Sequence, residues 1–238
     1  MKGYKLTLTE WTANRVIKGI TWMICRVDVD QLVKVPLQGP LIVASNHINI
    51  LEVPIIYTRL SPRPMTGFSK TESWDSPAIG WLFDLWGIIP IRRGEADRTA
   101  LKKGLEVLKE GYILTIAPEG TRSHDGRLQR GLPGIAMMAL LSGSPILPLA
   151  HYGHEGYKQN LRKLRRTDFH AVVGEPFMLR KPDHKVNRKV RQKMVDEIMF
   201  QLARLLPPAY RGVYADLSQA TEDYIDFNHP QLNNIFRS

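Results

Sequence analysis

Cysteine is almost absent from the sequence, since Cys25 is the only one among 238 residues. A single thiol excludes an internal disulfide and fits a reducing compartment. No grouping of cysteine and histidine has the spacing of a zinc site either. We therefore expect neither a disulfide framework nor a metal centre, and a hydrophobic core must hold the fold together.

Long hydrophobic runs are also missing. Residues 131–152 contain no Asp, Glu, Lys or Arg, but glycine and proline interrupt them at Pro133, Gly134, Gly143, Pro145 and Pro148. These interruptions predict a short buried helix and a buried strand instead of a membrane-spanning helix. The N-terminus has no continuous apolar region followed by a cleavage site, so we expect no secretory signal.

Positive charge, by contrast, is abundant and unevenly placed. The formal net charge is +10 at pH 7, and residues 156–193 carry 12 Lys and Arg against 3 Asp and Glu. Such a segment suits anionic lipid headgroups, an acidic carrier protein or nucleic acid, unless it is only a solvated face. Aromatic residues do not interleave with the basic ones as in proteins that bind single strands, so we expect no nucleic-acid partner.

Apolar runs alternate with helical patterns along the chain. We predict strands over residues 40–44, 65–69, 88–91, 112–117, 146–150 and 169–173, and helices over residues 53–57, 76–86, 96–110, 133–142 and 187–206. Strands that alternate with helices indicate βαβ units. The sequence therefore predicts an α/β fold with a mostly parallel central sheet flanked by helices.

The first residues differ in character from the rest. Residues 6–27 read as an amphipathic helix with Trp11 and Trp22, and its basic residues are Arg15, Lys18 and Arg26. This composition is typical of a helix that lies in a membrane interface, although a helix covering the core is the alternative. We predict a membrane-associating helical segment over residues 1–30, an α/β domain over 31–213 and a C-terminal tail over 214–238.

The residues that point most directly to chemistry follow the strand predicted over residues 40–44. His47 lies in the turn after this strand, and Glu52 lies in the first turn of the next helix. A carboxylate on one imidazole nitrogen leaves the other free as a general base. No serine nucleophile elbow or Cys–His pair is visible, so a substrate hydroxyl is the expected proton source. The alternative is a capping box of Asn49 and Glu52, with His47 a mere turn residue.

Other predicted strands also end in polar residues. Lys70, Arg93 and the loop 119–122 each follow such a strand. The carboxyl ends of parallel strands meet at one edge of a sheet, where ligands bind. We therefore expect these groups to gather around His47 in one site.

Four ordered motifs resemble those of the glycerolipid acyltransferases, most closely the bacterial 1-acyl-glycerol-3-phosphate acyltransferase group. They are Asn46-His47 with Glu52 after four further residues, and residues 87–93, 118–123 and 146–149. Lys70 and Glu72 fit a further block of the family, and the resemblance covers about residues 38–180. The family's usual acid is aspartate, and here it is Glu52.

The resemblance implies transfer of a fatty acyl group from acyl-CoA or acyl carrier protein to a lysophospholipid hydroxyl. The expected acceptor is 1-acyl-glycerol-3-phosphate, and the product is phosphatidic acid. His47, oriented by Glu52, would act as general base without an acyl-enzyme. The implied substrate-binding residues are Lys70, Arg93, Glu119, Gly120, Thr121 and Arg122. The three cations would hold the acceptor phosphate, and Glu119 and Thr121 would shape the loop. No cofactor or metal is implied.

The resemblance also implies a peripheral protein on the cytoplasmic face of the cell membrane, held by anionic lipids. Three other interpretations remain open. The acceptor could be glycerol-3-phosphate, another lysophospholipid or a glycolipid. Water could replace the acceptor, which would make the protein an acyl thioester hydrolase. The chain could also be a non-catalytic module for lipid surfaces.

Overall fold

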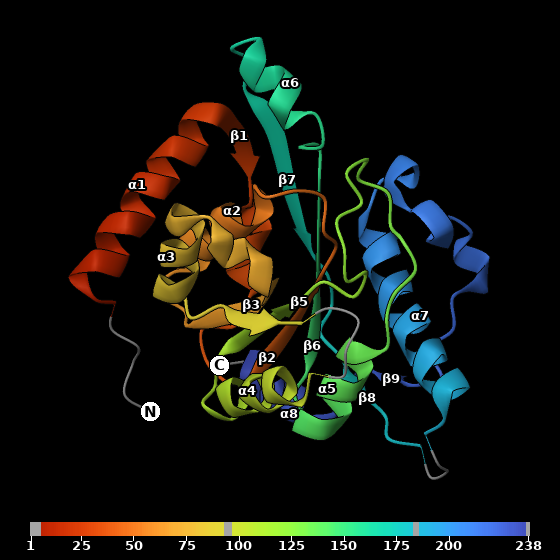
Figure 1. Ribbon diagram of the computed structural model, residues 1–238. Helices are drawn as coiled ribbons and strands as arrows, with labels where there is room; N and C mark the ends of the chain where they lie inside the picture. Colours follow the sequence, from red (N-terminus) through yellow and green to blue (C-terminus); the bar gives the residue numbers. More distant parts are fainter. Residues whose placement is uncertain (1–5, 93–96, 183–185, 237–238) are drawn as a thin grey trace.

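A seven-stranded sheet forms the centre of the molecule, and helices cover both of its faces (Figure 1). The structure is a computed structural model, and it describes residues 6–92, 97–182 and 186–236. The strand order across the sheet is β1-β7-β6-β2-β5-β3-β4. A second sheet of two strands pairs β8 with β9.

The strands are β1 (Cys25–Asp28), β2 (Leu41–Ser45), β3 (Met65–Lys70), β4 (Ile89–Ile91), β5 (Ile113–Ile116), β6 (Ile146–Tyr152), β7 (Thr167–Val173), β8 (Met178–Leu179) and β9 (Ile225–Asp226). The α-helices are α1 (Leu8–Ile24), α2 (Glu52–Leu60), α3 (Pro77–Leu85), α4 (Arg98–Lys109), α5 (Gly134–Ser142), α6 (Tyr157–Arg162), α7 (Arg188–Leu205) and α8 (Pro230–Phe236). Short 3-10 helices are η1 (Asp30–Lys34), η2 (Thr71–Asp75), η3 (Pro208–Tyr210), η4 (Gly212–Tyr214) and η5 (Leu217–Gln219).

The five strands from β6 to β4 in spatial order run parallel to one another. Strand β7 is antiparallel to β6, and β1 is parallel to β7. The mostly parallel sheet predicted from the sequence is therefore confirmed. Pro90 lies in β4, which is the edge strand of the sheet. Proline has no backbone N–H to donate to a neighbouring strand, so an edge strand tolerates it best.

Side chains of β2 show how the sheet divides the core into two layers. Ile42 and Ala44 pack into a cluster with residues of α4, α5 and α7. Leu41 and Val43 pack into a second cluster with residues of α1, α2 and α3. Since both faces are covered, the strand is apolar at consecutive positions instead of alternating with polar residues.

The helix predicted over residues 6–27 ends earlier than expected. Helix α1 stops at Ile24, and Cys25 begins β1, which pairs with β7. Cys25 is fully buried, whereas Arg26 points away and forms an ion pair with Asp168, at 2.6 Å between Nε and Oδ1. Alternating burial in a strand this short also satisfies a helical pattern, which explains the error. Arg26 therefore has a partner within the protein.

The uncharged stretch over residues 131–152 forms α5 and β6, as its glycine and proline residues predict. Over the described ranges, no helix combines the length and the hydrophobicity that crossing a bilayer requires. The polar segment after α7 is fixed to that helix by the buried carboxylate of Glu197. This carboxylate accepts hydrogen bonds from Thr221 Oγ1 at 2.6 Å, Asp223 N at 3.0 Å and Tyr224 N at 2.9 Å.

Candidate active site

The predicted polar groups lie at the carboxyl ends of neighbouring parallel strands. His47 follows β2, the loop 119–122 follows β5, and Lys70 is the last residue of β3. Because β5 lies between β2 and β3, these segments lie in a row along one edge of the sheet. Arg93, the fourth predicted member, lies outside the described residues.

His47 and Glu52 are in direct contact. His47 lies in the turn before α2, Glu52 is the first residue of that helix, and His47 Nδ1 is hydrogen-bonded to Glu52 Oε1. The His47 side chain is 18% exposed. Its other ring nitrogen, Nε2, has no hydrogen-bond partner among the described residues. The pair therefore leaves one imidazole nitrogen open to a substrate.

The second oxygen of Glu52 holds the turn itself. Oε2 accepts hydrogen bonds from the backbone N–H of Asn49 at 3.1 Å and contacts Nε2 of His154 at 3.2 Å. The Asn49 side chain accepts from the N–H of Leu51 at 2.9 Å, not from that of Glu52. Half of the proposed capping box is therefore present, and the same carboxylate serves both the helix start and His47.

Glu52 is kept ionised although it is 5% exposed. Burial by itself would raise the pKa of this carboxyl, but the hydrogen bonds to His154 and His47 and the nearby imidazoles outweigh it and hold the pKa far below its ordinary value. Its place in the first turn of α2 adds the favourable end of the helix dipole. A carboxylate in this state stabilises a positive charge on His47.

Two buried asparagines join this turn to the end of β6. Asn46 Nδ2 donates to the carbonyl of His151 at 2.8 Å, and Asn46 Oδ1 accepts from the N–H of His151 at 2.9 Å. Asn49 Nδ2 donates to the carbonyl of His154 at 2.8 Å. The turn that carries His47 is therefore tied to a segment 105 residues away in the sequence.

Glu119 positions His47 through the backbone. Its Oε1 accepts from the N–H of His47 at 2.9 Å, and its Oε2 accepts from the N–H of Gln129 at 2.8 Å. Ser123 N–H donates to the carbonyl of His47 at 2.8 Å, so the loop is hydrogen-bonded to both the N–H and the carbonyl of His47. Glu119 is buried, and burial raises its pKa to about 7 although the two hydrogen bonds oppose the rise.

The loop between Glu119 and Ser123 turns sharply at Gly120. Its φ is +67°, and a Cβ there would lie 2.6 Å from Leu132 Cδ1, so only glycine fits. Thr121 and Arg122 are exposed on this turn. Lys70 is exposed at the end of β3, about 10 Å from the axis of β2 because neighbouring strands are about 4.8 Å apart. Within the described ranges, the side chains of Lys70 and Arg122 have no hydrogen bond or ion pair to the protein.

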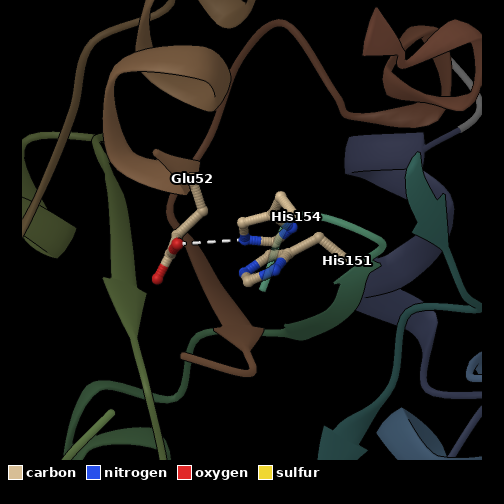
Figure 2. A group of neighbouring side chains, drawn as sticks. All are labelled: Glu52, His151 and His154. Atoms are coloured by element: carbon tan, nitrogen blue, oxygen red, sulfur yellow. Dashed lines mark hydrogen bonds and ion pairs between the residues drawn. The ribbon is translucent and has the colours of Figure 1, made fainter. Parts of the chain in front are cut away.

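Sequence analysis missed two histidines of this site, which Figure 2 shows beside Glu52. His151 and His154 are fully buried, and both lie near the carboxyl end of β6. Both ring nitrogens of His151, and Nδ1 of His154, lack a hydrogen-bond partner in the described part of the chain. Burial lowers the pKa of His151 to about 3, so this ring is neutral. The strand-end rule that selected His47 would also have selected these two residues.

The same three side chains have the chemistry of metal ligands. Within the described ranges, Glu52, His151 and His154 are the group of His, Cys, Asp and Glu residues whose ligand atoms converge, all within 4.8 Å of one another. Glu52 and His154, which are hydrogen-bonded at 3.2 Å, are 102 residues apart in the sequence. Motif spacing could therefore not reveal the group.

The chain is similar in sequence to known proteins. Residues 26–152 match the model of the acyltransferase family. The chain is 34% identical over 132 residues to the chloroplastic 1-acyl-sn-glycerol-3-phosphate acyltransferase BAT2 of Brassica napus. This alignment covers 54% of this chain and 38% of that relative. It is 27% identical over 143 residues to the 1-acyl-sn-glycerol-3-phosphate acyltransferase of Bacillus subtilis strain 168, covering 60% of this chain and 69% of the relative.

A solved structure has a similar fold. The 1-acyl-sn-glycerophosphate (LPA) acyltransferase PlsC from Thermotoga maritima aligns with a TM-score of 0.60 over 82% of this chain and 79% of that chain, at 23% sequence identity. This likeness concerns the fold. The chain spans less than half the length of the chloroplast relative and about two thirds of the Bacillus relative.

Proposed function

The chain belongs to the acyltransferase family, and from this premise we propose that it acylates 1-acyl-glycerol-3-phosphate to phosphatidic acid. The acyl donor is a thioester of coenzyme A or acyl carrier protein. The observation that carries the proposal is the His47–Glu52 pair at the carboxyl edge of the sheet, in which the Nε2 nitrogen of His47 has no partner among the residues that the structure describes. The names of the plant and bacterial relatives support the choice of acceptor.

In the proposed reaction, His47 Nε2 removes the proton of the acceptor hydroxyl as its oxygen attacks the thioester carbonyl carbon. The tetrahedral intermediate collapses, the carbon–sulfur bond breaks, and His47 returns the proton to the departing thiolate. Glu52 stabilises the imidazolium that exists between these two transfers. Cys25 is buried in β1, three strands away from β2 in the sheet, so the one thiol of the sequence is not placed to form an acyl-enzyme beside His47.

We assign the acceptor phosphate to the exposed basic side chains at the same edge of the sheet as His47. Arg122 lies one residue before Ser123, whose N–H is bonded to the His47 carbonyl, and Lys70 ends a strand on the same edge. Guanidinium groups bind phosphate through two parallel hydrogen bonds, which fixes the hydroxyl relative to His47. Arg93 is proposed for the same role from its place in the sequence.

We also propose that the protein binds the cytoplasmic face of the cell membrane. Helix α1 exposes Trp22 and Met23 by 67% and 63%, and the segment with α6 exposes Leu164 by 95%. Arg166 joins these two segments, because it donates hydrogen bonds to the backbone carbonyls of Trp22 and Cys25. Apolar side chains beside basic ones are typical of proteins that insert shallowly into anionic membranes.

Product analysis with purified protein tests the proposal. The protein is incubated with acyl-CoA or acyl carrier protein as donor and with a panel of lysophospholipids, glycerol-3-phosphate and lysoglycolipids as acceptors. We expect phosphatidic acid from 1-acyl-glycerol-3-phosphate at the highest kcat/KM. Thiol release that does not depend on the acceptor would show a hydrolase, and a faster reaction with another lipid would overturn the acceptor assignment.

A further inference from the structure

We propose that Glu52, His151 and His154 form a site for a divalent transition-metal ion of the zinc type, and that a bound ion slows proton transfer by His47. The inference goes beyond the proposed function, because metal binding itself does not depend on which lipid is acylated. Figure 2 shows the three side chains converging from α2 and from the end of β6.

The donor set suits such an ion. One carboxylate oxygen and two imidazole nitrogens are a common ligand set for zinc in proteins. Ligands of a tetrahedral zinc ion lie about 3.3 Å apart, since each bond is about 2.0 Å long. Glu52 Oε2 and His154 Nε2 are already 3.2 Å apart. All three ligand atoms lie within 4.8 Å, so His151 has to approach by about 1.5 Å at most.

Three of the four ring nitrogens of the two histidines lack a protein partner in the described part of the chain. Buried polar groups are almost always hydrogen-bonded, yet both nitrogens of His151 and Nδ1 of His154 have no partner in the described part of the chain. Both backbones are held in place, His151 by Asn46 and His154 by Asn49. An imidazole nitrogen binds a metal through its lone pair, and the fixed backbone limits the reorganisation that binding requires.

Local charge also favours a cation. Glu52 is buried, and within the described ranges its ion-pair partners are His47 and His154 only, with no Lys or Arg among them. A divalent ion would supply the positive charge that this carboxylate lacks. A water molecule bridging the three groups is the competing explanation for the unpartnered nitrogens, and it brings no charge.

A bound ion would act on His47 through Glu52. The ion takes Oε2, whereas Oε1 still accepts from His47 Nδ1. Electron density drawn toward the metal weakens the stabilisation of the His47 imidazolium, so the proton transfer becomes slower. This consequence rests on the proposed function, but the binding does not.

Cobalt(II) titration of the full-length protein tests the site without any lipid substrate. The protein is treated with a chelator and dialysed. It is then incubated overnight with Co²⁺ because the ligands are buried, and visible absorption and metal content are measured. We expect one ion per chain, a tetrahedral d–d spectrum without the thiolate band that Cys25 would give, and displacement by Zn²⁺. Zn²⁺ should also raise the melting temperature.

His151→Phe is the diagnostic variant, because the ring can still stack on Phe169 while the ligand is lost. His124→Asn, an exposed histidine with φ of +62°, is the matched control. We expect Co²⁺ affinity to fall about tenfold or more in His151→Phe and to be unchanged in the control. If His151→Phe does not fold, as judged by circular dichroism, His151→Asn takes its place.

The proposal is overturned if the wild-type protein binds no stoichiometric Co²⁺ or Zn²⁺, which would favour the water bridge. It is equally overturned if binding survives the loss of His151. For the regulatory part, the metal-loaded protein should transfer acyl groups at least about fivefold more slowly than the chelated protein, and His151→Phe should be insensitive to Zn²⁺. An inactive protein that still binds Co²⁺ through His151 would refute the proposed function and leave the metal site standing.

Discussion

At the scale of single residues, one carboxylate connects the proposed base, the start of α2 and a buried histidine. Glu52 touches the proposed base through Oε1, and the helix start and His154 through Oε2. The sequence alone was sufficient to pair His47 with Glu52, because the two residues are five positions apart, one in the turn and the other at the start of the next helix. It could not assign His154 to Glu52, since only the folded sheet brings the ends of β2 and β6 side by side.

Replacing Glu52 with glutamine should separate its two roles. Glu52→Gln keeps the size of the side chain but removes the charge that stabilises the His47 imidazolium. We expect kcat for acyl transfer to fall about 100-fold or more, measured under chelating conditions. An unchanged kcat with a loss of only about 1 kcal/mol in the free energy of unfolding would leave Glu52 as a helix cap.

Glu119 should make the stability of the protein depend on pH. Its pKa is about 7 in the folded protein against an ordinary value of 4.5, so the folded state holds this proton more tightly than the unfolded chain. The resulting stabilisation is fully present below about pH 4.5 and is lost as pH rises through about 7. It amounts to about 3 kcal/mol at most.

Urea denaturation at a series of pH values can isolate this effect. Glu119→Gln cannot titrate, so the free energy of unfolding of the wild type should fall relative to that of the variant by up to about 3 kcal/mol between pH 4.5 and 8. Parallel pH profiles for the two proteins would exclude a raised pKa at Glu119.

At the scale of elements, the sequence predicted the parallel strands, whose apolar residues are buried on both faces of the sheet, and it predicted the helices that connect these strands. It failed where a helix passes directly into a strand, at Ile24 and Cys25, because no glycine or proline marks the change. It also did not foresee α6, which has no buried residue and thus no hydrophobic pattern to recognise. The elements best predicted were those with the largest share of the core.

The link between the ends of β2 and β6 can be tested at Asn46. Asn46→Ala leaves the N–H and carbonyl of His151 without their buried partners, so we expect a loss of about 1–3 kcal/mol in the free energy of unfolding. Asn228→Ala, at an exposed position near the C-terminus, should change it by less than about 0.5 kcal/mol. Similar losses in the two variants would mean that the link contributes little.

At the scale of the whole molecule, the apolar surface and the site share one end of the sheet. Helix α6 begins five residues after β6 ends, and it lies close to the carboxyl end of α1 (Figure 1). A lipid acceptor could thus move from the bilayer to His47 without leaving the surface. Five basic residues on or directly after α6 add positive charge at this end, namely Lys158, Arg162, Lys163, Arg165 and Arg166.

Liposome binding should depend on the exposed side chains of α1 and the α6 segment. Trp22→Ala combined with Leu164→Ala removes two apolar groups that are 67% and 95% exposed, and we expect binding to anionic liposomes to weaken about tenfold or more. Val213→Ala, which is 69% exposed on η4, is the control. High salt should weaken wild-type binding only in part, because apolar insertion is not screened. Unchanged co-sedimentation of the double variant would rule out this surface.

His47 is proposed as the base of an acyl transfer to a lipid hydroxyl. The most direct test measures radiolabelled phosphatidic acid formed from acyl-CoA and 1-acyl-glycerol-3-phosphate by the wild type and by His47→Gln. Both proteins are first shown to have the same melting temperature and the same liposome binding. We expect product from the wild type and a rate at least about 100-fold lower from the variant. Comparable product formation by the folded variant would contradict it.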